Sequence, residues 1–275
     1  LYDVRESIVR IRVENTHLEE DELFDLRRSL STIDGIVKIL NHSDDDEAEQ
    51  EDGWRREKKY PYPALHRLSA DVMSFPQLVQ RIDQILDKFG KIRDNATPEL
   101  LQIRRELAKT EGSISRTLYG ILRAAQSEGV VEKDVTPTLR DGRLVIPVIP
   151  TLKRKIKGIV HDESATGRTV FIEPTEVVEA NNRVRELEGE ERKEIIRILT
   201  DFTNKVRPFS HEILDSYRFL AVIDLIQAKA KLAETQQAIE PEVEAHPHVD
   251  WTRAIHPLLR LSLEKKGEKV VPLDI

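Results

Sequence analysis

Cysteine is absent from the 275 residues, which excludes disulfide bonds and thiolate metal sites. Aromatic residues make up only 5% of the chain and glycine occupies only 11 positions, as is typical of long solvent-exposed helices rather than a compact enzyme with a deep pocket. No run of 18 apolar residues occurs, so we expect no membrane span and no membrane partner. The first residues also lack the apolar segment of a signal peptide, and we expect a cytoplasmic protein.

Nucleotide-binding and catalytic motifs are missing as well. Neither G-x-x-x-x-G-K-[ST] nor G-x-G-x-x-G occurs, so we expect this chain to bind no cofactor and to hydrolyse no nucleotide on its own. The stretch GIVHDESATGRTVFIEP, residues 158–174, brings together His161, Asp162 and Ser164. A catalytic triad needs side chains that converge from separate places, whereas adjacent strand residues point to opposite faces. We therefore predict no catalytic residue here.

One short segment contains residues of the types that bind metals, namely Glu244, His246, His248 and Asp250. In an extended segment the two histidines share a face, as a metal-binding pair can. The proline between them and the lack of a second group of ligands favour a polar linker between domains, so we predict no metal site. His256, beside Pro257, is expected to be a packed and hydrogen-bonded structural residue.

The N-terminal half reads as amphipathic helix interrupted by one acidic stretch. Thr16 and Glu19 have the spacing of a capping box. Apolar residues then recur at steps of three and four, which predicts one buried helix face: Leu23, Leu26, Leu30, Ile33, Val37 and Leu40. Residues 42–53 include seven acids among twelve positions, which predicts an exposed loop.

Two runs of about 30 residues carry matching apolar stripes. The first extends from Pro98 to Ser127, with Thr97 as its cap, and the second opens at Glu173-Pro174-Thr175 and ends before Pro208. Each would form a helix of about 45 Å. Equal lengths and matching stripes predict an antiparallel pair.

The segment between these helices reads as β structure. Residues 144–150 (LVIPVIP) predict an edge strand, because proline is tolerated there. Residues 156–161 and 168–172 predict a hairpin closed by DESATG. The predicted fold is therefore mainly α, a long-helix lever with a small β-rich clamp inserted at the tip of an antiparallel helix pair.

Four domains follow from this organisation. Residues 1–138 are the helical core and first lever helix, 139–173 the β-rich clamp, 174–240 the returning lever helix and helical core, and 241–275 a linker and the start of an incomplete domain. In that last part we expect a turn at Gly267 and a strand at Val270-Val271.

The predicted tip has a charge unlike the rest of the chain. Residues 140–170 contain seven bases and three acids, a local balance of +4, whereas the whole chain carries −7. Nucleic-acid backbone is the natural partner, because Lys and Arg neutralise phosphate without reading sequence. The alternative is a strand edge protected by lysine, and charge alone leaves both open. The predicted binding residues are Arg143, Lys153, Arg154, Lys155, Lys157 and Arg168.

Three sequence blocks resemble the MutS family, and most closely its second bacterial branch, the MutS-two proteins. They are GRLVIPV, KIKGIVHDESATGRTVFIEPTEVVEANNRVRELE, and RAIHPLL followed by VVPLDI. The resemblance covers essentially the whole chain, although the N-terminal part matches by helical pattern more than by motif. It implies a core and lever region with a clamp, and an ATPase domain beginning near Arg253. The phosphate loop, and with it ATP and Mg, would belong to the full-length parent.

The resemblance also implies a function. Family members are ATP hydrolases that dimerise through their ATPase domains and encircle nucleic acid, and nuclease activity is assigned to a separate Smr domain not found here. A mismatch-reading domain is also not found, which fits this branch. The implied role is binding of DNA or ribosomal RNA backbone in recombination suppression or ribosome rescue. A purely structural coiled-coil arm that makes protein–protein contacts stays open as an alternative, and a small hydrolase would need a converging site.

Overall fold

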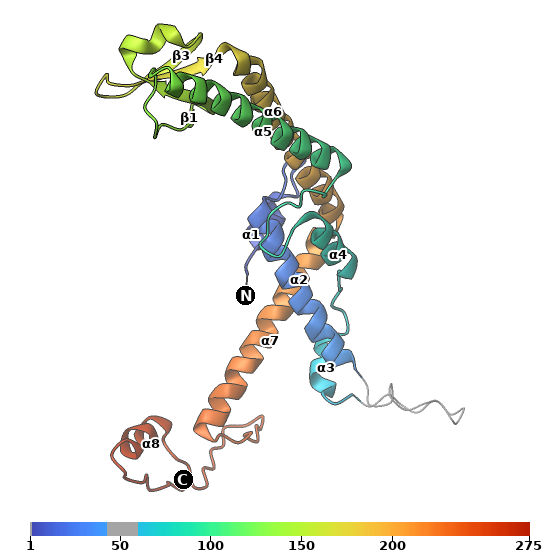
Figure 1. The fold of residues 1–275 in the computed structure, drawn as a ribbon. Helices are drawn as coiled ribbons and strands as arrows, with labels where there is room; N and C mark the ends of the chain where they lie inside the picture. The colour runs from blue at the N-terminus through green and yellow to red at the C-terminus, as the bar shows by residue number, and fades with distance from the viewer. Residues whose placement is uncertain (1, 43–59) are drawn as a thin grey trace, which may run out of the picture. The chain divides into compact units, whose positions relative to one another are not determined.

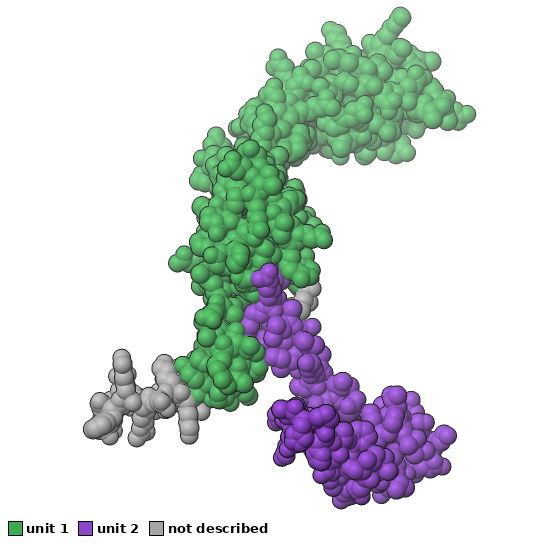
Figure 2. Space-filling view, turned by 180° about the vertical axis from the view of Figure 1, so that it is seen from behind, with its two compact units in different colours: residues 1–216 green, residues 217–275 purple. Residues whose placement is uncertain are grey.

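The computed structural model describes residues 2–42 and 60–275, so most of the predicted acidic loop lies outside the described residues. The described chain is mainly helical with one small antiparallel sheet, which confirms the predicted fold class (Figure 1). It divides into two compact units, residues 1–216 and 217–275, coloured green and purple in Figure 2. This division falls inside α7 (Ser210–Gln236), at none of the expected domain boundaries, and the four-domain division stays a prediction. No helix in the described residues is long and apolar enough to cross a membrane.

The first unit begins with α1 (Arg5–Arg10) and α2 (Glu20–Asn41), followed by α3 (Pro63–Ser69) and α4 (Pro76–Ile85). The apolar residues predicted to form one face of α2, from Leu23 to Leu40, are all buried. The predicted cap was wrong by three residues, because Glu19 is the N-cap and forms the capping box with Glu22. Thr16 instead donates its hydroxyl to the Val13 carbonyl (2.7 Å), which closes the turn after α1.

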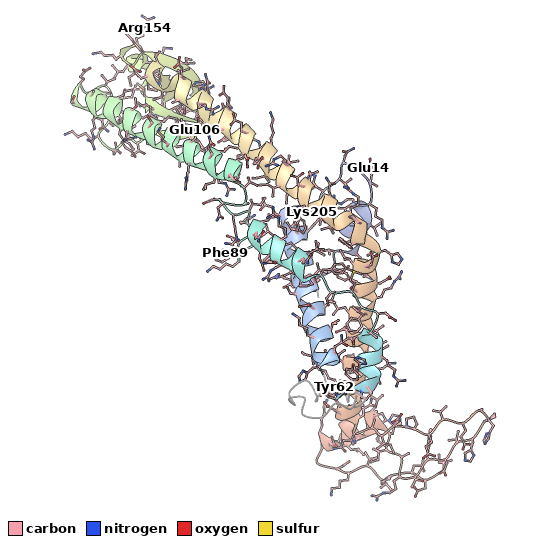
Figure 3. All side chains as sticks on the ribbon, turned by 90° about the vertical axis from the view of Figure 1, so that its right-hand side faces the viewer. Glu14, Tyr62, Phe89, Glu106, Arg154 and Lys205 are labelled. Carbon is pink, nitrogen blue, oxygen red and sulfur yellow. The ribbon has the colours of Figure 1, made fainter. Side chains whose placement is uncertain are left out.

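Helices α5 (Pro98–Ser127) and α6 (Val178–Val206) form a long antiparallel pair, here called the arm, and lie side by side in Figures 1 and 3. Their cross-links show the direction, since the partner number falls along α6 as the number rises along α5. Thr97 bonds Glu194 (2.7 Å), Arg104 bonds Glu191 (2.7 Å), and Arg183 bonds Glu106 (2.9 Å). These bonds fix the N-terminal third of α5 in register with the middle of α6.

Helix α5 begins at Pro98 with Thr97 as its N-cap, as the sequence predicts, and a substitution of Thr97 tests the cap. Thr97 Oγ1 accepts a hydrogen bond from the Leu100 amide (3.1 Å) and donates one to Glu194. Thr97→Ala should lower the free energy of unfolding by about 1 kcal/mol, because the amide loses its capping partner. Urea denaturation followed by circular dichroism measures this. Thr97→Ser, which retains the hydroxyl, should stay near wild type, and an equal loss in both variants would contradict the capping role.

Residues 138–174, here called the tip module, hold a four-stranded antiparallel sheet in the order β1-β2-β4-β3. The strands are β1 (Thr138–Arg140), β2 (Arg143–Val148), β3 (Gly158–Glu163) and β4 (Val170–Pro174). The predicted hairpin is confirmed as β3–β4, with Gly167 at φ +67° in its turn. The sheet shares one core with the C-terminal half of α5 and the first turns of α6, formed by residues that include Leu118, Ile146, Ile172 and Val184.

The prediction of an edge strand at residues 144–150 was wrong, because β2 has β1 on one side and β4 on the other. The pairing with β1 stops at Val145, opposite Thr138. Pro147 lies beyond this point, where β2 pairs only with β4. Its missing amide hydrogen therefore removes no ladder bond to β1, and the proline is tolerated as it would be on an edge.

The second unit, residues 217–275, contains the rest of α7 and α8 (Pro257–Glu264). Gly267 forms the predicted turn at φ +79°, but the strand predicted at Val270-Val271 is replaced by an isolated bridge between Ala254 and Leu273. His256 is hydrogen-bonded as predicted, since its Nδ1 accepts from the Leu259 amide (3.3 Å). It is exposed rather than packed, because its role is to cap α8.

Candidate nucleic-acid interface

Three of the predicted binding residues, Lys153, Arg154 and Lys155, lie in the 3₁₀ helix η2 (Pro150–Lys155). Pro150 starts this helical turn one residue after β2 ends, and the three cations lie between β2 and β3. Buried Ile156 and partly buried Leu152 hold η2 against the module core, so the three cations face solvent. Figure 3 shows Arg154 at the outer end of the arm, far from Lys205.

Lys157 and Arg168 extend this charge to the two ends of the hairpin. Lys157 directly precedes β3, where its carbonyl accepts from the Thr175 amide (3.1 Å) while its side chain stays exposed. Arg168 lies in the β3–β4 turn and is exposed as well. Neither these two side chains nor the three cations of η2 form a hydrogen bond or ion pair within residues 2–42 and 60–275. We call these five residues the tip cations.

Arg143, the sixth predicted residue, has a different environment. Its Nη1 donates to Glu173 Oε1 (2.7 Å) and its Nη2 donates to Asn182 Oδ1 (2.6 Å). Only 14% of the side chain is exposed. The guanidinium is thus held inside the tip module, and we do not count it among the tip cations.

Glu173 is the residue that sequence reasoning missed. Its side chain is fully buried. The carboxylate accepts hydrogen bonds from Arg143 and from Asn181 Nδ2 (2.7 Å), and it lies 2.5 Å from His161 Nε2. Burial raises the pKa of this carboxyl, but the hydrogen bonds from Asn181, His161 and Arg143 and the charge of Arg143 together hold it below its ordinary value. One carboxylate therefore joins β2, β3 and β4 to the first turn of α6.

The residues considered above for catalysis and for metal binding have structural contacts of their own. Ser164 Oγ accepts from the Thr169 amide (3.0 Å) and so serves the hairpin turn, while His161 is directed to Glu173. Near the C-terminus, His246 pairs with Glu244 (3.0 Å) and its ring lies 6.1 Å from that of His248. In the part of the chain that is described, no group of three or more His, Asp or Glu side chains could hold a metal ion.

Comparison with known proteins gives a consistent result. No family model matches the chain. Three proteins named Endonuclease MutS2 are similar over all 275 residues, at 34% identity in Latilactobacillus sakei, 37% in Levilactobacillus brevis and 32% in a Geobacillus strain. The chain matches one segment of the MutS2 proteins. The resemblance inferred from its motifs is thereby confirmed.

The chain spans 32% of the length of each of these MutS2 relatives. The relatives are named as endonucleases, so the MutS2 family is one of enzymes.

Proposed function

We propose that this chain is the lever and nucleic-acid clamp region of a MutS2-family ATPase, and that its tip grips DNA or ribosomal RNA backbone without reading mismatches. The observation that carries this proposal is the set of five exposed, unpaired tip cations on one small module of a chain with net charge −7. Lys and Arg neutralise phosphate whatever the base sequence, so such a surface suits backbone contact.

The arm supplies the mechanical part of the proposal. Helices of about 45 Å, fixed in register by cross-links at Arg104 and Arg183, would carry a small rotation at one end into a large displacement at the other. In the parent, ATP and Mg bound by the ATPase domain would set that rotation, and dimerisation through the same domain would pair two clamps. The biological setting would be recombination suppression or ribosome rescue.

A structural coiled-coil arm for protein–protein contacts is the competing function. It accounts equally for the long antiparallel helices and their apolar stripe. It gives no reason for five unpaired cations at the tip, since cations that only keep a surface soluble are commonly interspersed with acids. The charge at the tip favours the nucleic-acid function.

The test is a variant of the 275-residue chain in which all five tip cations are replaced by glutamine. On duplex DNA, the slope of log K against log salt concentration should fall in magnitude by about 0.9 for each lost phosphate contact, or about 4.5 for five. Fluorescence anisotropy between 50 and 200 mM salt measures the slope, and an RNA duplex of the same length tests the ribosomal alternative.

The matched control replaces three exposed bases of α6 by glutamine, each without a hydrogen bond or ion pair in the part of the chain that the structure describes: Arg192, Lys193 and Lys205. These residues lie among the carboxylates of α6, so their loss should leave the slope near wild type. If the tip variant is folded by circular dichroism and binds both duplexes with an unchanged slope, the clamp proposal is wrong and the tip cations only protect the module's surface.

A further inference from the structure

A second row of cations runs along α5, apart from the tip module. Arg105, Lys109, Arg116 and Arg123 are separated by steps of four, seven and seven residues. At 3.6 residues per turn these steps place all four on one face, within roughly 40° of each other. Tyr119 lies on the same face between the last two and is 47% exposed. We call this row the α5 track.

The α5 track faces away from the packed side of the helix. The buried residues of α5, among them Leu100, Ile114 and Leu118, lie on the opposite side. Gly112 and Gly120 fall on the track side, and a Cβ built at either glycine meets no atom within 4 Å. Nothing in the described chain therefore covers this face near those two positions.

Acidic residues are absent from the track, although α5 contains them. Glu106 is turned toward α6, where it pairs with Arg183, and Glu99 and Glu111 lie well to either side of the track by helical spacing. Arg105, Lys109 and Arg123 are exposed and form no hydrogen bond or ion pair within the described residues. Arg116 donates only to the Gly112 carbonyl one turn earlier (3.2 Å).

Two arginines of the neighbouring helix show what a compensated surface looks like, although Arg192, Lys193 and Lys205 of that helix form no ion pair within the described residues. On α6, Arg183 contacts the carboxylates of Glu106, Glu186 and Glu190, and Arg197 contacts those of Glu194 and Asp201. Such interleaved pairs are typical of a solvated helix. The α5 track has the charge without the pairing, although both helices belong to the same arm.

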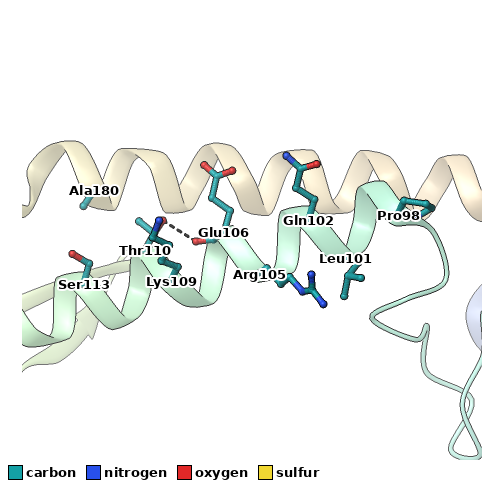
Figure 4. A pocket seen from close by; sticks show the side chains of 9 residues that line it. All are labelled: Pro98, Leu101, Gln102, Arg105, Glu106, Lys109, Thr110, Ser113 and Ala180. Atoms are coloured by element: carbon teal, nitrogen blue, oxygen red, sulfur yellow. Dashed lines mark hydrogen bonds between the residues drawn. The ribbon is translucent and has the colours of Figure 1, made fainter.

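The N-terminal end of the track lies at a shallow groove of about 770 Å³ along the arm (Figure 4). Figure 4 shows the Arg105 side chain directed away from the α6 ribbon, whereas Glu106 and Gln102 point toward it. The groove wall is formed mostly by α5, with Ala180 from α6. Arg105 and Lys109 line the groove together with Glu106, whose carboxylate is already paired with Arg183.

We propose that the α5 track binds the phosphate backbone of duplex DNA, as a contact additional to the tip. The proposal rests on the proposed nucleic-acid function and extends it to the lever. From Arg105 to Arg123 the track measures about 27 Å, roughly four fifths of a duplex turn of about 34 Å, so one duplex lying along α5 can present phosphates to it over its whole length. The Tyr119 hydroxyl can donate to a phosphate as well.

A protein partner fits this surface less well. Specific protein interfaces have an apolar or aromatic centre from which water is excluded. Tyr119 is the single large apolar or aromatic residue of α5 among the exposed residues of the described chain. Cations around one tyrosine provide charge without such a centre, so duplex DNA is the better occupant.

The experiment compares three variants of the 275-residue chain on a 30-base-pair DNA duplex. The track variant carries Arg105→Gln, Lys109→Gln and Arg123→Gln, which keep helix propensity. The α6 variant described above removes the same number of cations from the same arm, and the tip variant removes the five tip cations. The track variant should lower the salt slope by about 2.7, at 0.9 for each of three contacts, while the α6 variant stays near wild type.

Each outcome decides between the two proposals. If the tip variant loses slope and the track variant does not, the track inference is wrong and the clamp stands. If the track variant loses slope and the tip variant does not, the clamp is wrong and the track stands. Equal losses in the track and α6 variants indicate a general charge effect and overturn the inference, as does a track that binds an acidic polypeptide or an RNA duplex in preference to the DNA.

Discussion

Replacement of Glu173 by alanine should separate the tip module from the start of α6. The substitution leaves the largely buried Arg143 guanidinium without its carboxylate and the Asn181 amide with only its longer bond to the Leu144 carbonyl (3.3 Å). Breaking a buried ion pair by removing one partner costs about 3–5 kcal/mol, because the other charge stays desolvated. We expect this loss to be concentrated in the sheet and the first turns of α6.

Hydrogen exchange by mass spectrometry measures the effect locally. Amides of β2 and β4 should exchange much faster in Glu173→Ala, while those of α2 keep their protection. Glu173→Gln is the matched control, because it keeps the size and an acceptor oxygen but removes the charge, and its loss should be smaller. Wild-type protection of β4 in Glu173→Ala would show that the network adds nothing to the packing of the module.

The stability of wild type and that of Glu173→Gln should also depend differently on pH. The folded pKa of Glu173 lies below the value of about 4.3 expected in the unfolded chain. The stabilisation by the carboxylate is therefore fully present above that value and is lost as pH falls through the folded pKa. The stability difference between wild type and Glu173→Gln should accordingly shrink below about pH 4.

The arm and the hairpin could be predicted from the sequence because their signals are local. Thr97-Pro98 marks a helix start within two residues, and DESATG marks a turn whose Gly167 takes positive φ. Apolar steps of three and four then define which faces are buried. Each of these features depends on neighbours close in the chain, so no tertiary information was needed.

Features that depend on partners far apart in the chain were not predictable in this way. The cap of α2 is a local exception, because Thr16 has the sequence of a cap but its hydroxyl bonds back to Val13, and Glu19 takes the capping role. Glu173 looks like an ordinary end of a strand until Arg143 and Asn181 are brought to it from 30 residues before and eight after. The separation of Arg143 from the tip cations likewise required the folded geometry.

The cations themselves were identified from composition, but only part of their arrangement was. Local charge counts drew attention to residues 140–170, where bases outnumber acids. The α5 track escaped that count because Glu99, Glu106 and Glu111 offset its charge along the sequence. Only the helical face, with Glu106 turned to Arg183, separates the two signs.

Replacement of Gly158 by alanine is the second substitution with a large expected effect. Gly158 begins β3 opposite Pro174, and a Cβ there would lie 2.2 Å from the Glu173 carbonyl oxygen and 2.8 Å from Ile172 Cγ2. A backbone oxygen cannot move aside as a flexible side chain can, so β3 must shift away from β4. Overpacking of this kind costs about 1–3 kcal/mol, and here it also displaces Lys157 beside the strand.

The control for Gly158→Ala is the same substitution at Gly120, in the middle of α5, where a Cβ meets nothing within 4 Å. An alanine at that position should raise stability by about 0.4–1 kcal/mol, because it restricts the unfolded chain and favours the helix. Thermal denaturation should therefore move in opposite directions for the two variants, and exchange of the β3 amides should rise only in Gly158→Ala. If Gly158→Ala is as stable as wild type with β3 still protected, β3 and β4 are not held as closely as the Gly158–Glu173 approach requires.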